Sequence, residues 1–255
     1  MKYFTKEWYA AYRRSGALYY KTIPDKDCTE ENIAEIYRNF KEYCRQRAQE
    51  SKQDKKSARS TFTIRWNNLK RRAKAVLPEW VIETVDERLT ALGFIPESVY
   101  ATLKEEIEAE MEIYEKRLGD GRAVLKAQRI PREIKSRFRF SNATVLGARR
   151  SGKDFHLFIE SDGEDKCSPR VKIIFRNAYS VDREIGLRIV TGEDEKYGFV
   201  FSNCKYLYEE IYRTDRGYEF HFLLWTQRAL RYLTVACEDV GFDADFDIGE
   251  IRKGK

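Results

Sequence analysis

The stretch most suggestive of chemistry is GARRSGK at residues 147–153, which is nearly a phosphate-binding loop. Such a loop lies between a strand and a helix, and a Ser or Thr after its Lys supplies a hydroxyl to magnesium. Here Asp154 follows the Lys and would place negative charge beside the phosphates. The next residues, FHLFI, have the character of a strand and not of a helix. We therefore predict a basic hairpin tip at residues 149–153 in place of a nucleotide site.

The sequence has two histidines, His156 and His221, and each lies in a strand-like segment among bulkier apolar residues. This alternation predicts that both lie on the less apolar face of a sheet. A His pair on adjacent strands could bind a metal or transfer protons. No Ser or Cys nucleophile motif accompanies them, so we interpret both as structural or solvated. An enzyme whose site lies between the two halves, formed by these histidines and the C-terminal aspartates, stays open as an alternative.

The C-terminal segment DVGFDADFDIGE resembles an acidic calcium loop. An EF-hand loop that began at Asp243 would require Gly at position 248 and Glu at position 254, where the sequence has Ile248 and Gly254. Apolar residues instead alternate with the aspartates, which predicts a strand with an acidic outer face that discourages aggregation. The four aspartates are Asp239, Asp243, Asp245 and Asp247. We expect neither a metal nor a cofactor.

Positive charge is concentrated between residues 38 and 74, where thirteen Lys or Arg stand against three Asp or Glu, an excess of ten. The following acidic helix could neutralise it, so the simplest interpretation is attraction between solvated helix faces. One alternative is a nucleic-acid interface that contacts phosphates through Lys70, Arg71 and Lys74 beside Asn67. Another is an acidic protein partner. The candidate anion contacts are Arg65, Lys70, Arg71, Lys74, Arg149 and Arg150.

The five cysteines are widely spaced and no pair has the C-x-x-C spacing of common zinc or redox sites. They predict a reduced, cytoplasmic protein with structural thiols. The sequence also contains no run of 18 apolar residues and no apolar leader segment, so we expect no membrane association. A 42% hydrophobic content with 14% aromatic residues indicates a folded chain despite 35% charged residues.

Helical periodicity dominates the first half of the chain. Thr29 is a suitable N-cap for the second helix, and Pro78 and Pro96 each begin another helix. Gly93 suits a C-terminal cap, and Gly119-Asp120-Gly121 should end the fifth helix near Leu118. The expected helices cover about residues 4–14, 29–48, 58–76, 78–92 and 96–118. Short connections between them predict an antiparallel bundle.

From Phe138 onward the pattern changes to period two, with many β-branched and aromatic residues. Gly, Asp and Ser clusters separate the segments and leave no room for crossover helices, so the pairing should be antiparallel. The expected strands cover residues 138–148, 154–160, 171–178, 186–190, 199–201, 205–212, 218–225 and 230–237. The fold class is therefore α+β: a helical bundle at 1–119, a linker with a short helix at 120–137, and an antiparallel β-domain at 138–255. A curled sheet or a small sandwich is the natural architecture.

The opening MKYFTKEWY, followed by a helical region and a β-domain, resembles an uncharacterised bacterial family known only as a domain of unknown function. The second half is similar to small, partly immunity-like bacterial β-modules. Those modules have a Leu-His-Asp-Ala-type segment where this sequence has FSNA at 140–143, and they share the strand YEFH at 218–221 and the acid-rich ACED at 236–239. The resemblance implies a bacterial cytoplasmic setting and supplies no reaction.

The leading functional hypothesis is a non-enzymatic macromolecule-binding or immunity-like protein. It depends on the lack of a catalytic motif and on the segregation of charge. Nucleic-acid binding through residues 38–74 is the first alternative, and an enzyme with an interdomain site is the second. The sequence leaves the oligomeric state and the identity of any partner open.

Overall fold

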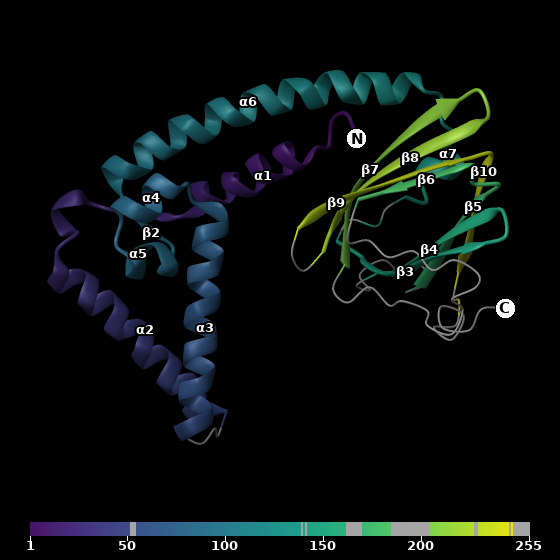
Figure 1. The fold of residues 1–255 in the computed structure, drawn as a ribbon. Helices are drawn as coiled ribbons and strands as arrows, with labels where there is room; N and C mark the ends of the chain where they lie inside the picture. The colour runs from purple at the N-terminus through teal and green to yellow at the C-terminus, as the bar shows by residue number, and fades with distance from the viewer. Residues whose placement is uncertain are drawn as a thin grey trace. The chain divides into compact units, whose positions relative to one another are not determined.

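A computed structural model describes residues 1–51, 55–138, 140, 142–161, 170–184, 204–226, 229–244 and 246, with only the backbone of Lys55. These residues form two compact units. The helical unit comprises Glu7–Lys116, and the sheet unit comprises Met1–Lys6 together with Arg117–Lys255. Figure 1 shows the elements of both units. The α+β class and the order of helices before strands are as the sequence predicts.

The helical unit begins with α1 (Lys6–Arg14), a short 3-10 helix (Ser15–Tyr19) and β1 (Lys21–Ile23). Helix α2 (Glu30–Glu50) begins at the predicted N-cap, where the Thr29 hydroxyl accepts a hydrogen bond from the Asn32 amide at 3.3 Å. Helix α3 (Lys55–Val76) returns antiparallel to α2 (Figure 1). We call the α2–α3 hairpin the arm.

The single helix predicted between Pro78 and Leu92 is wrong, because the structure has two. Helix α4 (Glu79–Thr84) ends at Val85, whose backbone is extended, and α5 (Glu87–Leu92) begins at a new cap. There the Asp86 carboxylate accepts the Arg88 amide at 2.7 Å, which competes with continuation of the helix. Gly93 ends α5 in the left-handed conformation, as predicted. The next residues form β2 (Phe94–Pro96), which pairs in parallel with β1, and this pairing was not predicted.

The predicted end of a helix near Leu118 is also wrong, since α6 runs from Glu97 to Ala127. Gly119 and Gly121 lie inside it. A Cβ at Gly121 would come within 2.3 Å of the Tyr3 ring, so this glycine allows the N-terminal segment to lie against the helix. The expected linker at 120–137 thus begins inside α6, and the short α7 (Arg132–Lys135) follows that helix.

The core of the helical unit lies where the C-terminal end of α3 meets α4, α5, β2 and α6. Its most buried members include Ala73, Val81, Leu89, Ile95 and Leu103. Toward its far end the arm instead depends on a thin seam of half-buried aromatic residues between α2 and α3. The seam consists of Tyr37, Phe40, Phe62 and Trp66.

The sheet unit contains eight described strands, all paired antiparallel in the order β10-β5-β4-β3-β7-β8-β9-β6. They are β3 (Thr144–Ser151), β4 (Asp154–Glu160), β5 (Arg170–Arg176), β6 (Ser180–Arg183), β7 (Cys204–Thr214), β8 (Gly217–Trp225), β9 (Leu230–Cys237) and β10 (Asp239–Ala244). The strands expected at 186–190 and 199–201 lie outside the described residues, and β6 was not predicted. The acidic C-terminal strand is partly confirmed as β10, which lies at an edge of the sheet.

The first strand starts at Thr144 and not at Phe138, so the predicted start is wrong. Phe138 and Phe140 alternate because both rings are buried in the sheet core, while their own backbone is not in a strand. The ring of Phe138 lies 5.2 Å from that of Phe220. A segment that packs on a sheet without being a strand can thus also bury every second residue.

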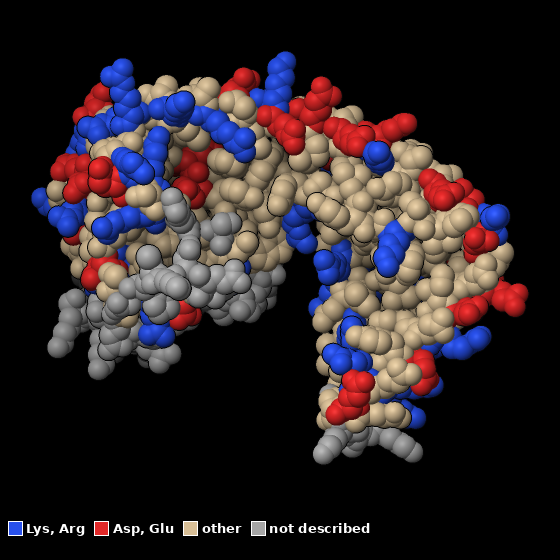
Figure 2. All heavy atoms as spheres, turned by 180° about the vertical axis from the view of Figure 1, so that it is seen from behind, with Lys and Arg blue, Asp and Glu red and all other residues tan. Residues whose placement is uncertain are grey.

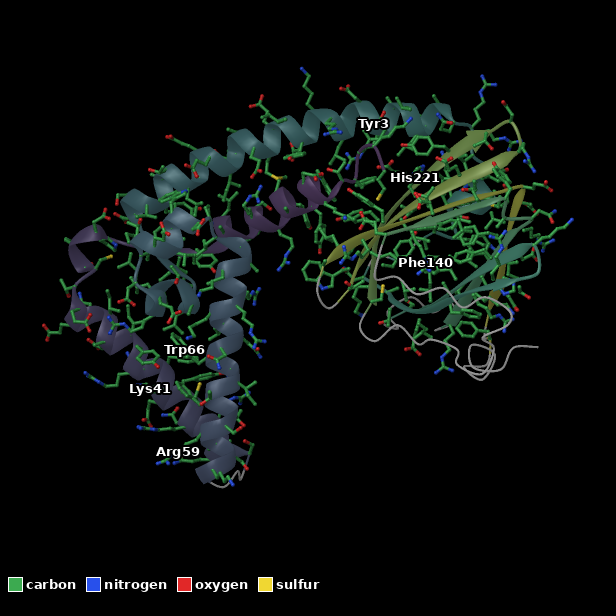
Figure 3. The ribbon with its side chains drawn as sticks, viewed as in Figure 1. Tyr3, Lys41, Arg59, Trp66, Phe140 and His221 are labelled. Atoms are coloured by element: carbon green, nitrogen blue, oxygen red, sulfur yellow. The ribbon has the colours of Figure 1, made fainter. Side chains whose placement is uncertain are left out.

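The sheet curls around an aromatic core. Phe175 on β5 and Phe220 on β8 have ring centroids 5.1 Å apart, although β4, β3 and β7 lie between their strands. Such a contact requires strong curvature, which the twist of antiparallel strands allows. Figure 3 shows Phe140 within this curl. The sequence left a curled sheet and a sandwich open, and the structure has one curled, unclosed sheet.

Candidate nucleic-acid interface

Helix α3 carries much of the positive charge of the arm. Its sequence KKSARSTFTIRWNNLKRRAKAV contains eight Lys or Arg and no Asp or Glu over 22 residues. An acid-free helix of this length cannot neutralise its own charge through i,i+4 pairs. Figure 2 shows Lys and Arg along the edge of the arm that α3 forms.

One side of α3 is polar along almost its whole length. Its residues recur at intervals of three or four, which places them in one row on the helix surface. We call this row the α3 stripe, and it consists of Lys56, Arg59, Thr63, Asn67, Lys70 and Lys74. At 1.5 Å per residue the stripe is about 27 Å long. Every side chain in it can donate a hydrogen bond.

Within the described residues, some of these charges have ion-pair partners and others do not. Lys70 Nζ lies 3.5 Å from Glu87, and its side chain is 28% exposed. Arg59, Lys74 and the adjacent Arg71 are exposed and have no ion-pair partner among the residues that the structure describes. The predicted contacts Lys70, Arg71 and Lys74 therefore lie together on one helix, as expected. Lys56 and Arg59 were counted in the basic segment at 38–74 but were not named as candidate contacts, although the absence of acids between residues 55 and 76 could have indicated them.

Helix α2 differs from α3 because its basic residues alternate with acids. Arg45 pairs with Glu42 at 3.2 Å, and Arg47 pairs with Glu50 at 3.0 Å. Both pairs join residues three apart on the exposed surface. Two of the four cations of α2 are thus paired within their own helix, whereas α3 contains no acid with which its cations could pair.

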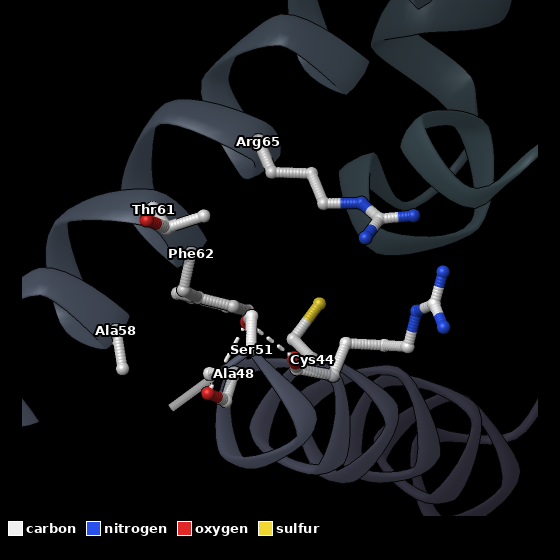
Figure 4. Close-up of a pocket in the computed structure, with 8 residues that line it drawn as sticks. Cys44, Ala48, Ser51, Ala58, Thr61, Phe62 and Arg65 are labelled. Carbon is white, nitrogen blue, oxygen red and sulfur yellow. Dashed lines mark hydrogen bonds between the residues drawn. The ribbon is translucent and has the colours of Figure 1, made fainter. Parts of the chain in front are cut away.

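The aromatic residues of the arm hold its two helices together. Trp66 lies in the seam (Figure 3), with its ring 4.9 Å from that of Tyr37. Arg65 is on the opposite side of α3 from the stripe, and its guanidinium lies 5.3 Å from the Tyr43 ring. Figure 4 shows Arg65 beside Cys44, in a small hollow between the helices. Contacts through the stripe would therefore be made to phosphates and not by stacking of bases.

The other two predicted contacts, Arg149 and Arg150, belong to the sheet unit. Residues 149–153 form the predicted hairpin tip, in which Ser151 pairs with Asp154 and Gly152 has a φ of +58°. A strand follows, so this is not a phosphate-binding loop. Both arginines are half-buried, and Arg150 Nη2 donates to the Ala178 carbonyl at 2.6 Å.

The two histidines do not lie on adjacent strands. His156 is on β4 and His221 is on β8, with β3 and β7 between them. At about 4.8 Å per strand they are on the order of 14 Å apart across the sheet. His221 Nε2 contacts Glu219 at 2.5 Å, and burial together with a nearby ammonium lowers the pKa of the imidazole. The paired-histidine site that motivated an enzyme is therefore not formed.

The described residues contain no group of three or more His, Cys, Asp or Glu placed to hold a metal. In the expected acidic strand, Asp243 pairs with Lys172 at 2.7 Å, while Asp245 and Asp247 lie outside the described residues. Cys204 and Cys237 are buried free thiols, and burial raises the pKa of each to about 12. Cys167 lies outside the described residues. In the described part of the chain, no helix combines the length and apolar character needed to cross a membrane.

Comparison with known proteins gives no family for this chain: no family model matches it, and no curated protein matches it. The resemblance to an uncharacterised bacterial family and to immunity-like modules thus stays a prediction.

Proposed function

We propose that this protein is a non-enzymatic nucleic-acid-binding protein that contacts the phosphate backbone through the α3 stripe. The observation that carries the proposal is the acid-free helix α3, whose polar side presents exposed cations in one row. The sequence predicted a macromolecule-binding protein, and the macromolecule proposed here is a nucleic acid. The proposed contacts are cations of α3, and Arg149 and Arg150 of the sheet unit are not among them.

The spacing of the stripe suits a backbone contact. Duplex DNA carries one phosphate per about 3.4 Å of axis on each strand, so a 27 Å row faces about eight base-pair steps. Lys and Arg bind phosphates as charges, while Thr63 and Asn67 add neutral donors between them. Contacts of this kind orient a protein on the helix and are largely independent of base sequence.

The test is fluorescence anisotropy with labelled duplex DNA, single-stranded DNA and duplex RNA, in which the salt concentration is varied from 50 to 300 mM. The variant R59E/K74E reverses two unpaired charges of the stripe. The control R45E/R47E makes the same change in net charge on the other helix of the arm. We expect the stripe variant to bind at least tenfold more weakly than the control. Because each lost phosphate contact reduces the salt slope by about 0.9, its log–log slope should also be shallower by about two.

Equal loss of affinity in both variants would overturn the proposal, since it would show a response to net charge alone. Binding that does not weaken with salt would also contradict a phosphate contact. If polyglutamate displaced the nucleic acid at an equal concentration of charge, an acidic protein would be the better partner class. Circular dichroism of both variants would establish that the helices are retained.

A further inference from the structure

The sheet unit contains a second, separate concentration of unpaired positive charge. A hollow of about 320 Å³ is bounded by α6, α7, β7 and the N-terminal segment. This size is in the range of small-molecule sites. The lining residues are Phe4, Arg122, Leu125, Lys126, Lys135, Glu209 and Ile211.

Three cations line this hollow, and no described anion forms an ion pair with them. Arg122 and Lys126 are four residues apart and so lie on one side of α6, while Lys135 comes from α7. Like charges at this spacing repel each other. None of the three has an ion-pair partner within the described part of the chain. An anion in the hollow would offset that repulsion.

Glu209 lines the hollow but is not an ion-pair partner of these cations. Its Oε2 accepts a hydrogen bond from the Tyr206 hydroxyl at 3.0 Å, and Tyr206 is fully buried. Burial raises the pKa of Glu209 to about 7, so near neutral pH a large fraction of this carboxyl is protonated. A protonated carboxyl can donate a hydrogen bond to an anionic ligand.

The remaining lining side chains are apolar. Leu125 and Ile211 present aliphatic groups, and Phe4 presents a ring that stacks on Tyr208 at 4.9 Å with an angle of 7° between the planes. The stacking holds Phe4 in a fixed orientation. A ligand in the hollow would therefore meet cations and an apolar wall.

We propose that this hollow binds a small organic phosphate with an aromatic or aliphatic body. The phosphate would lie among Arg122, Lys126 and Lys135, and the body would pack on Phe4, Leu125 and Ile211. This inference does not rest on the nucleic-acid proposal, because α3 belongs to the other unit. It also uses no residue of the α3 stripe.

Titration calorimetry with phenyl phosphate tests the site, with benzyl alcohol as a neutral ligand of similar shape. The variant R122Q/K126Q removes two cations of the hollow. The control K116Q/R132Q removes two cations outside the hollow, one from α6 and one from α7. We expect at least a tenfold loss of phenyl phosphate affinity in the first variant and less than a twofold change in the control. K135Q offers a milder single change if the double variant does not fold.

The pH dependence provides a second readout. Phenyl sulfate keeps one charge between pH 5.5 and 8, so any change in its affinity comes from the protein. Among the described residues, Glu209 is hydrogen-bonded to the Tyr206 hydroxyl, and it lines the hollow together with the three cations. Affinity should fall as the pH rises and Glu209 ionises, and this fall should be absent in E209Q.

No binding of phenyl phosphate by the full chain at millimolar concentration would overturn the proposal, as would equal losses in both double variants. Benzyl alcohol binding as tightly as phenyl phosphate would show an apolar site without anion recognition. R59E/K74E should bind phenyl phosphate normally. If phenyl phosphate did not bind, the nucleic-acid proposal would be unaffected. If the α3 stripe did not bind nucleic acid, the proposed phosphate site would be unaffected.

Discussion

Glu209 and Glu210 are neighbours on β7, yet their environments act on their carboxyl groups in opposite directions. Burial alone would raise the pKa of Glu210, which is 1% exposed. Hydrogen bonds from the amides of Lys2, Phe4 and Tyr3 and from the Tyr212 hydroxyl outweigh burial and lower that pKa. Within the described residues, Glu209 accepts hydrogen bonds from the Tyr206 hydroxyl and from its own amide only, which do not outweigh burial, and its pKa is raised. The number of donors therefore decides the charge of each group.

Glu210 should contribute stability that is lost in acid. Its folded-state pKa lies below the ordinary value, so stability is fully present above about pH 4.5 and falls as the pH drops through the folded pKa. E210Q replaces charge-assisted hydrogen bonds with weaker ones, and its amide group brings donors toward backbone donors. We expect a cost of about 2–4 kcal/mol at pH 7. Urea unfolding between pH 3 and 7 measures both the cost of E210Q at pH 7 and the loss of stability in acid. If E210Q lost as much stability between pH 7 and pH 3 as the parent protein, this role of Glu210 would be contradicted.

Glu209 should have the opposite effect on stability. Between pH 4.5 and about 7 the folded protein holds this proton while the unfolded chain has released it, so stability falls as the pH rises. The total loss is at most about 3 kcal/mol. E209Q stays neutral and should be more stable than the parent at pH 8 but not at pH 4.5. Thermal unfolding at these two pH values checks the sign, and equal effects at both would exclude a titration of Glu209.

At the scale of elements, the features predicted correctly from the sequence are those caused by residues close together in the chain. The Thr29 cap, the left-handed Gly93 and the 149–153 hairpin tip were all predicted, because each depends on residues a few positions apart. The division of the fourth helix at Asp86 was missed because a capping carboxylate competed with continuation of an amphipathic pattern. The end of helix α6 was predicted too early for another reason: Gly121 does not end the helix but leaves room for the distant Tyr3 ring.

Gly119 and Gly121 allow a matched test of that reason. Both are inside α6, where Ala is favoured over Gly by about 0.5–1 kcal/mol. A Cβ at Gly119 would meet nothing within 4 Å, so G119A should stabilise by that amount. A Cβ at Gly121 would overlap the Tyr3 ring, so G121A should destabilise and displace the N-terminal segment. Chemical denaturation compares the two, and equal stabilisation would show that Tyr3 does not require the glycine.

The candidate sites show the same dependence: a group of residues close together in the sequence could be predicted, and a group of distant residues could not. The basic segment was visible in the sequence because its members lie on one helix, and Lys70, Arg71 and Lys74 were identified there. The hollow in the sheet unit was not visible, since Phe4, Arg122, Lys135 and Glu209 are brought together from four separate segments. No local pattern predicts such a group. The histidines show the reverse case, in which two similar strand motifs lie three strands apart in the sheet.

At the scale of the whole molecule, the two ends of the chain contribute to the same unit. The amides of residues 2–4 bind a carboxylate more than 200 positions later, and Lys6 pairs with Glu184 at 2.6 Å. The N-terminal segment is thereby part of the sheet unit, although helices separate it from the sheet in sequence. Periodicity could not reveal this arrangement, because six residues are too few to show a pattern of their own.

A double-mutant cycle tests whether this segment and Glu210 act as one structural element. Deleting residues 2–6 removes three amide donors from the carboxylate and leaves the Tyr212 hydroxyl, which should cost several kcal/mol in unfolding free energy. In that background Glu210 has already lost its backbone partners, so E210Q should cost less than about 1 kcal/mol. The control E238Q removes a carboxylate that binds Asn177, and it should cost the same with and without the segment. Additive costs for the deletion and E210Q would show that the segment docks independently of Glu210, whereas strong coupling would show that this carboxylate holds the start of the chain on the sheet.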